Sequence, residues 1–355
     1  MSQAAAPARP LAPEALVVTM GDPAGIGGEV ALKAWLARGA GLPAFFLLDS
    51  PARLKAVASR LRLDVPIFPI SKPEEAKAAF QKGLPVLALR EVDALPSVEL
   101  GTPNPAWSKA VIASITQAVE LLRNGECSGL VTNPIHKASL YDAGFKHPGH
   151  TEFLAELTGG SPVMMLSAPG LKVIPITIHT ALKNVASQLT SAKIETCGRI
   201  LAQSLTQDFG IAQPRIAVAA LNPHAGENGA MGDEEGRIIQ PAVDKLRAEG
   251  IDIFDPAPAD TLFHQRARAR YDAVLCMYHD QALIPLKTID FDRGVNTTLG
   301  LPIVRTSPDH GTAFDIAAQG VANAESFIAA LHGAATMAAH RIESRTRGLT
   351  ENHNE

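Results

Sequence analysis

The chain has 355 residues, more than the roughly 250 to 300 that one hydrophobic core usually supports, so two domains or two lobes are expected. Hydrophobic residues make up 46% of the chain and charged residues 19%, which is typical of a globular protein and excludes a disordered or fibrous one. The net charge is −4 and no Lys/Arg cluster stands out, which argues against a nucleic-acid partner.

The cysteines Cys127, Cys197 and Cys276 are odd in number and widely spaced, which fits neither a disulfide framework nor a CxxC metal site. A reducing, cytoplasmic location is therefore expected. Residues 1–15 are rich in Ala and Pro without the apolar core of a signal peptide, so they are predicted to form a disordered tail. No apolar run approaches the roughly 20 residues that span a bilayer, and we expect no membrane association.

In chain order, the first half alternates short apolar runs with helical periodicity, and this alternation predicts a largely parallel sheet with helices on both faces. The predicted strands are residues 16–20, 44–48, 65–70, 86–89 and 128–132. The predicted helices are residues 29–38, 51–61, 73–81 and 105–123.

We place a lobe boundary near Val131. The first lobe would hold residues 16–131 and 290–345 and the second residues 132–289, with a polar tail at 346–355. In the second half, two apolar runs flank the turn residues 168–170 and predict a hairpin. The other predicted elements are strands at 216–221 and 273–278 and helices at 193–206, 233–249 and 324–341.

Three histidines, His179, His224 and His279, each stand at or just beyond the end of an apolar strand. Neutral imidazole is the commonest ligand of catalytic divalent metals, and three protein ligands with an open position mark a catalytic site. Each histidine taken alone fits a structural role better, but the coincidence at the ends of three strands weakens that alternative. Asp280, beside His279, could orient the imidazole, assist proton transfer or be a surface carboxylate.

The glycine-rich stretch Gly21–Gly27 (GDPAGIG) lies between a predicted strand and a predicted helix, where free N–H groups can bind an anion. A tight turn without a ligand is an equal alternative, because the spacing is not GxGxxG and the chain has no Rossmann fingerprint. In HPGHTE, Thr151 could cap a helix at 152–157, and His150 could contact an anion there. Lys287, Asn296 and Arg305 could hold a phosphate if they converge and are otherwise surface groups.

Six segments, in this order, resemble the 4-hydroxythreonine-4-phosphate dehydrogenase family of pyridoxal 5'-phosphate biosynthesis: LVTNPIHK, PGHTEFL, LNPHAGE, MYHDQALIPLK, GVNTTLGLP and RTSPDHGTAFDIA. The resemblance extends from about Val17 to Leu331. SPDHGTAFDIA is also similar to a segment of isocitrate and isopropylmalate dehydrogenases, which use NAD or NADP without a Rossmann domain. The implied fold is two α/β/α lobes with a cleft between them.

The resemblance also implies the residues of the site. His179, His224 and His279 would bind one divalent metal, zinc first, with magnesium, manganese or cobalt as alternatives. His150, Thr151, Lys287, Asn296 and Arg305 would contact a phosphorylated substrate. The loop Ser307, Asp309, His310, Gly311 and Thr312 would lie near NAD or NADP, and Asp280 and Lys287 are candidates for proton transfer. The family is homodimeric, with an active site completed across the interface.

The implied reaction is the NAD-dependent oxidation of 4-phosphooxy-L-threonine at C3. The product, 2-amino-3-oxo-4-(phosphooxy)butanoate, is a β-keto acid that loses CO2 to give 3-amino-2-oxopropyl phosphate. A related dehydrogenase of D-threonate or D-erythronate 4-phosphate is the nearest alternative, and a non-catalytic metal- and phosphate-binding protein is another. Gly28, Asn228 and Ala318 depart from the family pattern, which leaves cofactor preference and rate open.

Overall fold

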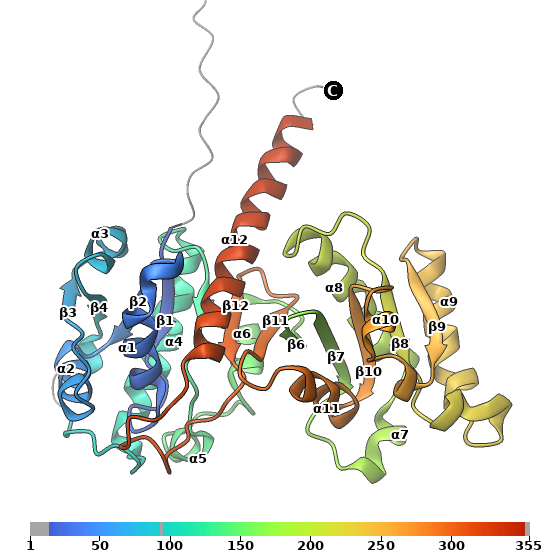
Figure 1. Cartoon of the computed structure of the whole chain (residues 1–355), viewed down its shortest axis with the longest axis horizontal. Coiled ribbons are helices and arrows are strands. Elements are labelled where there is room, and N and C mark those ends of the chain that lie inside the picture. Colours follow the sequence, from blue (N-terminus) through green and yellow to red (C-terminus); the bar gives the residue numbers. More distant parts are fainter. Residues whose placement is uncertain (1–13, 93–94, 352–355) are drawn as a thin grey trace, which may run out of the picture.

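A computed structural model describes residues 14–92 and 95–351, so the predicted N-terminal tail falls mostly outside the described residues. Ala15, which was assigned to that tail, is buried. Twelve strands of the described chain form one sheet, in the order β3-β4-β2-β1-β5-β12-β11-β6-β7-β10-β8-β9. Figure 1 shows this sheet running the whole length of the molecule, with helices along both faces, as expected from the alternating pattern.

β1 to β8 and β10 lie within two residues of the predicted apolar runs, whereas β9, β11 and β12 were not predicted. Their bounds are β1 Leu16–Thr19, β2 Phe45–Asp49, β3 Ile67–Ile70, β4 Leu84–Ala88, β5 Leu130–Val131, β6 Val163–Ala168, β7 Leu171–Thr177, β8 Ile216–Ala219, β9 Ile253–Ala257, β10 Ala273–Tyr278, β11 Val295–Leu299 and β12 Arg305–Pro308. β6 and β7 form the predicted antiparallel hairpin, whose turn ends at Gly170 with φ +79°. The remaining antiparallel pairs, β11/β12 and β11/β6, lie at the centre of the sheet.

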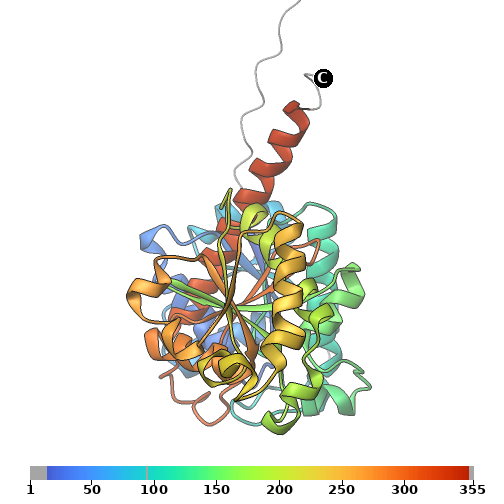
Figure 2. The ribbon, with the colours of Figure 1, turned by 90° about the vertical axis from the view of Figure 1, so that its right-hand side faces the viewer.

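The α-helices of the described chain cover both faces of the sheet. Their bounds are α1 Gly27–Leu36, α2 Pro51–Arg60, α3 Ala76–Phe80, α4 Ser108–Arg123, α5 Lys137–Asp142, α6 His150–Thr158, α7 Val185–Gln188, α8 Ser191–Gln207, α9 Gln240–Ala248, α10 Gln265–Arg268, α11 His279–Ile289 and α12 Glu325–Glu351. α12 runs ten residues beyond the predicted end at Arg341, through part of the expected polar tail, and its last turns project from the body in Figures 1 and 2.

Alternate residues of a strand point to opposite faces, so each buried strand supplies two apolar layers. In β1, Leu16 and Val18 pack with α1, α2 and α12, whereas Val17 packs with α4 on the other face. In the second half of the sheet, α8 and α9 cover one face and α11 the other. Figure 2 looks along the sheet from its β9 end and shows helices on either side of it.

Two starts of helices bear directly on the site. α6 begins at His150 after Gly149, whose backbone is fully extended, so the expected cap by Thr151 is wrong: the helix starts before Thr151 and has no side-chain cap. α11 begins at His279, immediately after β10. His150 and His279 therefore both stand in the first turn of a helix, where a short connection from strand or loop fixes their direction.

Candidate functional site

A cleft of about 760 Å³ lies at the centre of the sheet, where the two lobes meet. Both lobes line it, through the segment after β5, the start of α6, the ends of β7 and β10, and the strands β11 and β12. Most of the predicted site residues line this cleft: His150, Thr151, His179, His279, Lys287, Asn296, Arg305, Ser307, Asp309, His310 and Gly311. His224, Asp280 and Thr312 are not among its lining residues.

Arg305 in β12 is a buried cation, only 4% exposed. Its Nη1 donates to the Thr298 hydroxyl (2.9 Å) and its Nη2 to the Thr132 hydroxyl (2.6 Å), while Nε has no partner. No carboxylate of the described residues forms an ion pair with it, and burial lowers the pKa of its guanidinium to about 10. A buried charge without a counter-ion is costly, so this site fits a bound anion.

Other cleft residues also carry polar atoms without partners. His150 Nε2, Asn296 Oδ1 and His310 Nε2 are buried and make no hydrogen bond in the structure. Burial, followed by the charges of Arg305 and Lys137, holds the pKa of His150 well below its usual range, so its imidazole is neutral at pH 7. Buried polar atoms are normally hydrogen-bonded, and their convergence on one cleft indicates a polar ligand.

Lys287, near the end of α11, forms an ion pair with Asp309 of the loop after β12 (3.1 Å). The N–H of Asp309 in turn donates to the Ser326 hydroxyl at the start of α12 (2.9 Å). This ion pair joins the predicted substrate residues to the predicted cofactor loop. In that loop, a Cβ added at Gly311 would meet no atom within 4 Å, so the loop has open space beside it.

His179 and His279 lie together in the cleft, with ring centroids 6.1 Å apart. The Nδ1–H of His279 donates to the carboxylate of Asp280 (2.6 Å), which leaves Nε2 free to accept or to bind a metal. Asp280 thus acts on the cleft through His279. His224 is exposed, and among residues 14–92 and 95–351 no three His, Cys, Asp or Glu side chains are grouped closely enough to hold a metal ion.

The backbone at two of the predicted metal ligands is strained. His179 has φ +37° and His224 has φ +51°, both in the left-handed region that L-residues avoid. His224 belongs to Pro223–Gly229, in which the residues from 224 to 228 all have positive φ. Strain of this kind gathers at functional sites. The sequence offered one signal, because Asn228 replaces a common Gly and Asn tolerates this conformation.

The loop Gly21–Gly27 forms a turn in which four backbone N–H groups are already hydrogen-bonded. The N–H groups of Asp22, Gly25 and Ile26 donate to the carbonyls of Pro134, Asp22 and Thr312, and that of Ala24 to the Asp22 side chain. These donors are therefore not free for an anion. The loop instead packs the segment after β5 against the segment 312–314.

Lys137 and Glu152 line the cleft, although neither was singled out from the sequence. Both are exposed, and neither forms an ion pair with a described residue. The signal that could have found them is their place inside the segments NPIHK and GHTEF, within three residues of Pro134 and His150. Charged residues on such short segments look like ordinary solvated side chains until the fold brings the segments together.

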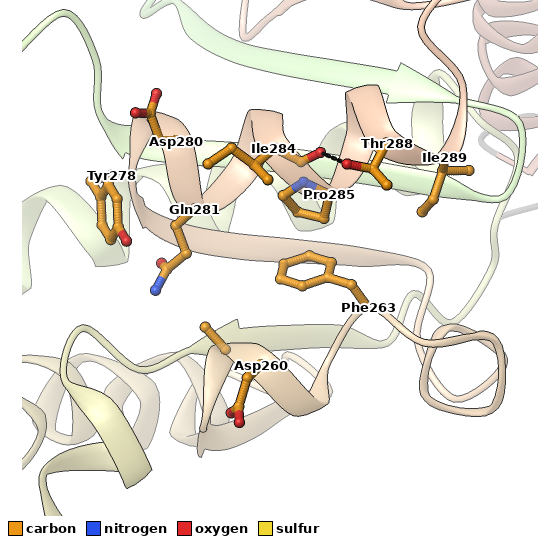
Figure 3. Close-up of a pocket in the computed structure, with 10 residues that line it drawn as sticks. Asp260, Phe263, Tyr278, Asp280, Gln281, Ile284, Pro285, Thr288 and Ile289 are labelled. Atoms are coloured by element: carbon orange, nitrogen blue, oxygen red, sulfur yellow. Dashed lines mark hydrogen bonds between the residues drawn. The ribbon is translucent and has the colours of Figure 1, made fainter.

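A second hollow, of about 410 Å³, lies on the opposite side of α11. Figure 3 shows Phe263 facing Pro285 across it, with Asp280 at the first turn of the helix. Ile284, which also lines it, is 64% exposed, and Phe291 just beyond the helix is 73% exposed. This apolar surface therefore lies directly behind the helix that carries His279 and Lys287.

Fold and cleft together define a two-lobed α/β protein whose central cleft is suited to bind an anion. Residues 43–334 match the family described as pyridoxal phosphate biosynthetic protein PdxA. The 4-hydroxythreonine-4-phosphate dehydrogenases of Caulobacter vibrioides and Methylorubrum populi are each 53% identical to the chain over 333 residues, covering 92% and 91% of it and 98% and 94% of those proteins. The chain belongs to the PdxA family.

Solved structures agree with this assignment. The crystal structure of 4-hydroxythreonine-4-phosphate dehydrogenase from Klebsiella pneumoniae has a TM-score of 0.82 at 39% identity and covers 92% of this chain and 98% of that one. A terephthalate 1,2-cis-dihydrodiol dehydrogenase from Burkholderia xenovorans shares the fold, with a TM-score of 0.62 at 24% identity over 91% of this chain and 98% of that one. No helix in the described part of the chain is long and apolar enough to cross a membrane.

Proposed function

We propose that the chain is a 4-hydroxythreonine-4-phosphate dehydrogenase, which oxidises 4-phosphooxy-L-threonine at C3 with NAD or NADP. The β-keto acid then loses CO2 to give 3-amino-2-oxopropyl phosphate, a step of pyridoxal 5'-phosphate biosynthesis. The observation that carries the proposal is the buried, uncompensated guanidinium of Arg305 in the central cleft. A phosphate monoester supplies the missing negative charge, and relatives of this name at 53% identity favour this substrate.

The proposed roles follow from the chemistry of the cleft residues. Arg305 Nε and His150 Nε2 have no partner and can donate to phosphate oxygens, with Thr151 beside His150 in the first turn of α6. Asn296 Oδ1, also without a partner, can accept from a donor group of the substrate. Lys287, which is paired with Asp309, would leave this ion pair to bind the substrate. Lys287 is also the first candidate for proton transfer. Holding the phosphate fixes C3 in the cleft. When bound, NAD supplies the hydride acceptor and a divalent metal supplies a Lewis acid.

The cofactor loop and the metal ligands are part of the same proposal. Ser307, Asp309, His310 and Gly311 would border the dinucleotide, which is supported by the unpartnered His310 Nε2 and the open space at Gly311. His179, His224 and His279 would bind a divalent metal, zinc first. The described residues of one chain do not make a complete metal site, so this proposal requires that groups from more than one subunit come together.

We propose that two copies form a homodimer that completes the site. The exposed apolar side chains Ile284 and Phe291, behind the helix that carries His279, support a buried contact there. Light scattering should give the mass of two chains. The three cysteines, all without a disulfide, support the proposed cytoplasmic location.

The test is NADH formation with 4-phosphooxy-L-threonine and with D-threonate or D-erythronate 4-phosphate, before and after chelation. We expect turnover of the amino-acid substrate, lost on chelation and restored by zinc. His279→Ala should reduce both turnover and bound metal to background without unfolding the chain. His332→Ala, which changes an exposed histidine of α12, is the matched control and should keep both.

Three outcomes would contradict the proposal. Preference for a sugar acid would move the chain to the related dehydrogenase. No turnover of any substrate with metal present would reject the enzyme, and full activity of His279→Ala would reject the metal site.

A further inference from the structure

The three cationic side chains that line the cleft, Arg305, Lys287 and Lys137, differ in the partners that they already have. Arg305 is held by two threonine hydroxyls, and Lys287 is paired with Asp309. Lys137 lines the same cleft, is exposed, and forms no ion pair with a described residue. Its ammonium group is therefore available to a negatively charged part of a ligand.

Glu152 stands beside Lys137 in the cleft wall. Both side chains approach Gly149: a Cβ built there would lie 3.6 Å from Glu152 Oε2, 3.6 Å from Lys137 Cε and 3.8 Å from Lys137 Nζ. Yet no ion pair joins the two, and Glu152 pairs with no other described cation. Two opposite charges thus stand close together on one rim of the cleft without neutralising each other.

Lys137 acts on both His150 and His179, and Glu152 acts on His179. Burial and then the Arg305 and Lys137 charges lower the pKa of His150, on the side of the anion-binding residues. Burial and then the Lys137 charge also lower the pKa of His179, which Glu152 raises. Lys137 and Glu152 therefore line the same cleft as the anion-binding residues and as His179 and His279, with Lys137 close enough to affect both His150 and His179.

A substrate with a phosphate at one end and an α-amino acid at the other carries three charged groups. A phosphate seated at Arg305 leaves a carboxylate and an ammonium group to be bound. We propose that Lys137 binds the carboxylate and Glu152 the ammonium group, so that these two residues recognise the α-amino-acid end of the substrate. This inference rests on the proposed function and assigns the choice between an amino acid and a sugar acid to Glu152.

The experiment measures dissociation constants by titration calorimetry for three ligands. 4-Phosphooxy-L-threonine has all three groups, D-erythronate 4-phosphate lacks the amino group, and inorganic phosphate has neither amino group nor carboxylate. Lys137→Gln should weaken the first two by about 10- to 100-fold, the loss of one charge-assisted hydrogen bond, and phosphate by less than about 3-fold. Glu152→Gln should weaken only 4-phosphooxy-L-threonine by a similar factor.

The controls separate this role from a structural one. Lys109→Gln on α4 and Glu156→Gln on α6 change exposed charges outside the cleft lining and should leave all three constants unchanged. Lys137→Arg should recover most of the affinity. In turnover, Lys137→Gln should raise KM with little change in kcat, because it removes binding that substrate and transition state share.

Equal loss for all three ligands would place Lys137 in the phosphate site and overturn the inference, as would unchanged constants in both variants. Equal weakening of the amino acid and the sugar acid by Glu152→Gln would overturn the role of Glu152. The binding assay needs no turnover, so a wild-type chain that binds the substrate without oxidising it would reject only the proposed function. A wild-type chain that does not bind 4-phosphooxy-L-threonine would reject both.

Discussion

Arg305→Met should abolish turnover and yet raise the free energy of unfolding of the ligand-free protein by about 1 kcal/mol. Burial lowers the pKa of the guanidinium from its usual range to about 10, which corresponds to a penalty on the order of 3 kcal/mol for the charged form. Methionine removes this penalty at similar length. Part of the gain is lost because the hydroxyls of Thr132 and Thr298 lose their donor, at about 1 kcal/mol each.

Urea unfolding measures the stability of the ligand-free protein, and its repetition with inorganic phosphate measures the stabilisation by a bound anion. Phosphate should stabilise the wild-type protein and have little effect on Arg305→Met, because a ligand stabilises only the folded state that binds it. Arg237→Met is the control, since Arg237 and its partner Asp233 are both more than half exposed, and it should shift stability by no more than about 0.5 kcal/mol. A variant that is less stable than the wild type without phosphate, or one that is still stabilised by phosphate, would contradict the assignment.

Gly21→Ala should lower the free energy of unfolding by roughly 3 kcal/mol or more and disturb the cleft as well. Gly21 has φ +65°, and a Cβ there would lie 2.6 Å from Asn133 Cβ and 2.7 Å from the Pro134 carbonyl oxygen. Asn133 is fully buried and bonded to Thr19, so it cannot move aside. Because Asn133 and Pro134 line the cleft, turnover should fall in the fraction that folds.

Gly125→Ala is the matched control for the backbone term. Gly125 has φ +75°, but a Cβ there would meet nothing within 4 Å. It should cost only about 1 kcal/mol, the price of a left-handed alanine. Thermal unfolding and turnover should be measured for both variants. Gly125→Ala reports the backbone strain alone, and Gly21→Ala reports the strain plus the steric clash with residues 133–134. Equal effects of the two substitutions would mean that this clash has no role.

The strand and helix order was predictable because buried runs and crossover helices leave a local periodic signal. β11 and β12 left no such signal, because most of their residues are polar although nearly all of them are buried, so neither strand contains an apolar run. Lys287, Asn296 and Arg305 were found through a resemblance of motifs; spacing along the chain could not tell a common site from three surface positions. Lys137 and Glu152 were missed for the same physical reason, because their meeting depends on how the segment after β5 packs against α6.

The three predicted metal ligands do not come together within the described residues of one chain. His179 and His279 follow neighbouring parallel strands, β7 and β10, so their approach is what strand order predicts. His224 follows β8, the next strand across, yet its left-handed turn carries it away from the cleft lining. Five successive positive φ values cannot be inferred from the sequence His-Ala-Gly-Glu-Asn, which contains only one glycine.

One continuous sheet joins the two lobes, and Asn296 and Arg305 sit on β11 and β12, the strands at its middle. The lobes are therefore not two rigid bodies on a flexible tether: rotating one against the other must twist the hydrogen-bonded ladder between these strands. An anion bound by Arg305 and Asn296 would therefore contact the two strands about which the lobes rotate. Binding of the anion would restrict the rotation of one lobe against the other, so occupancy of the cleft and the relative motion of the lobes are coupled.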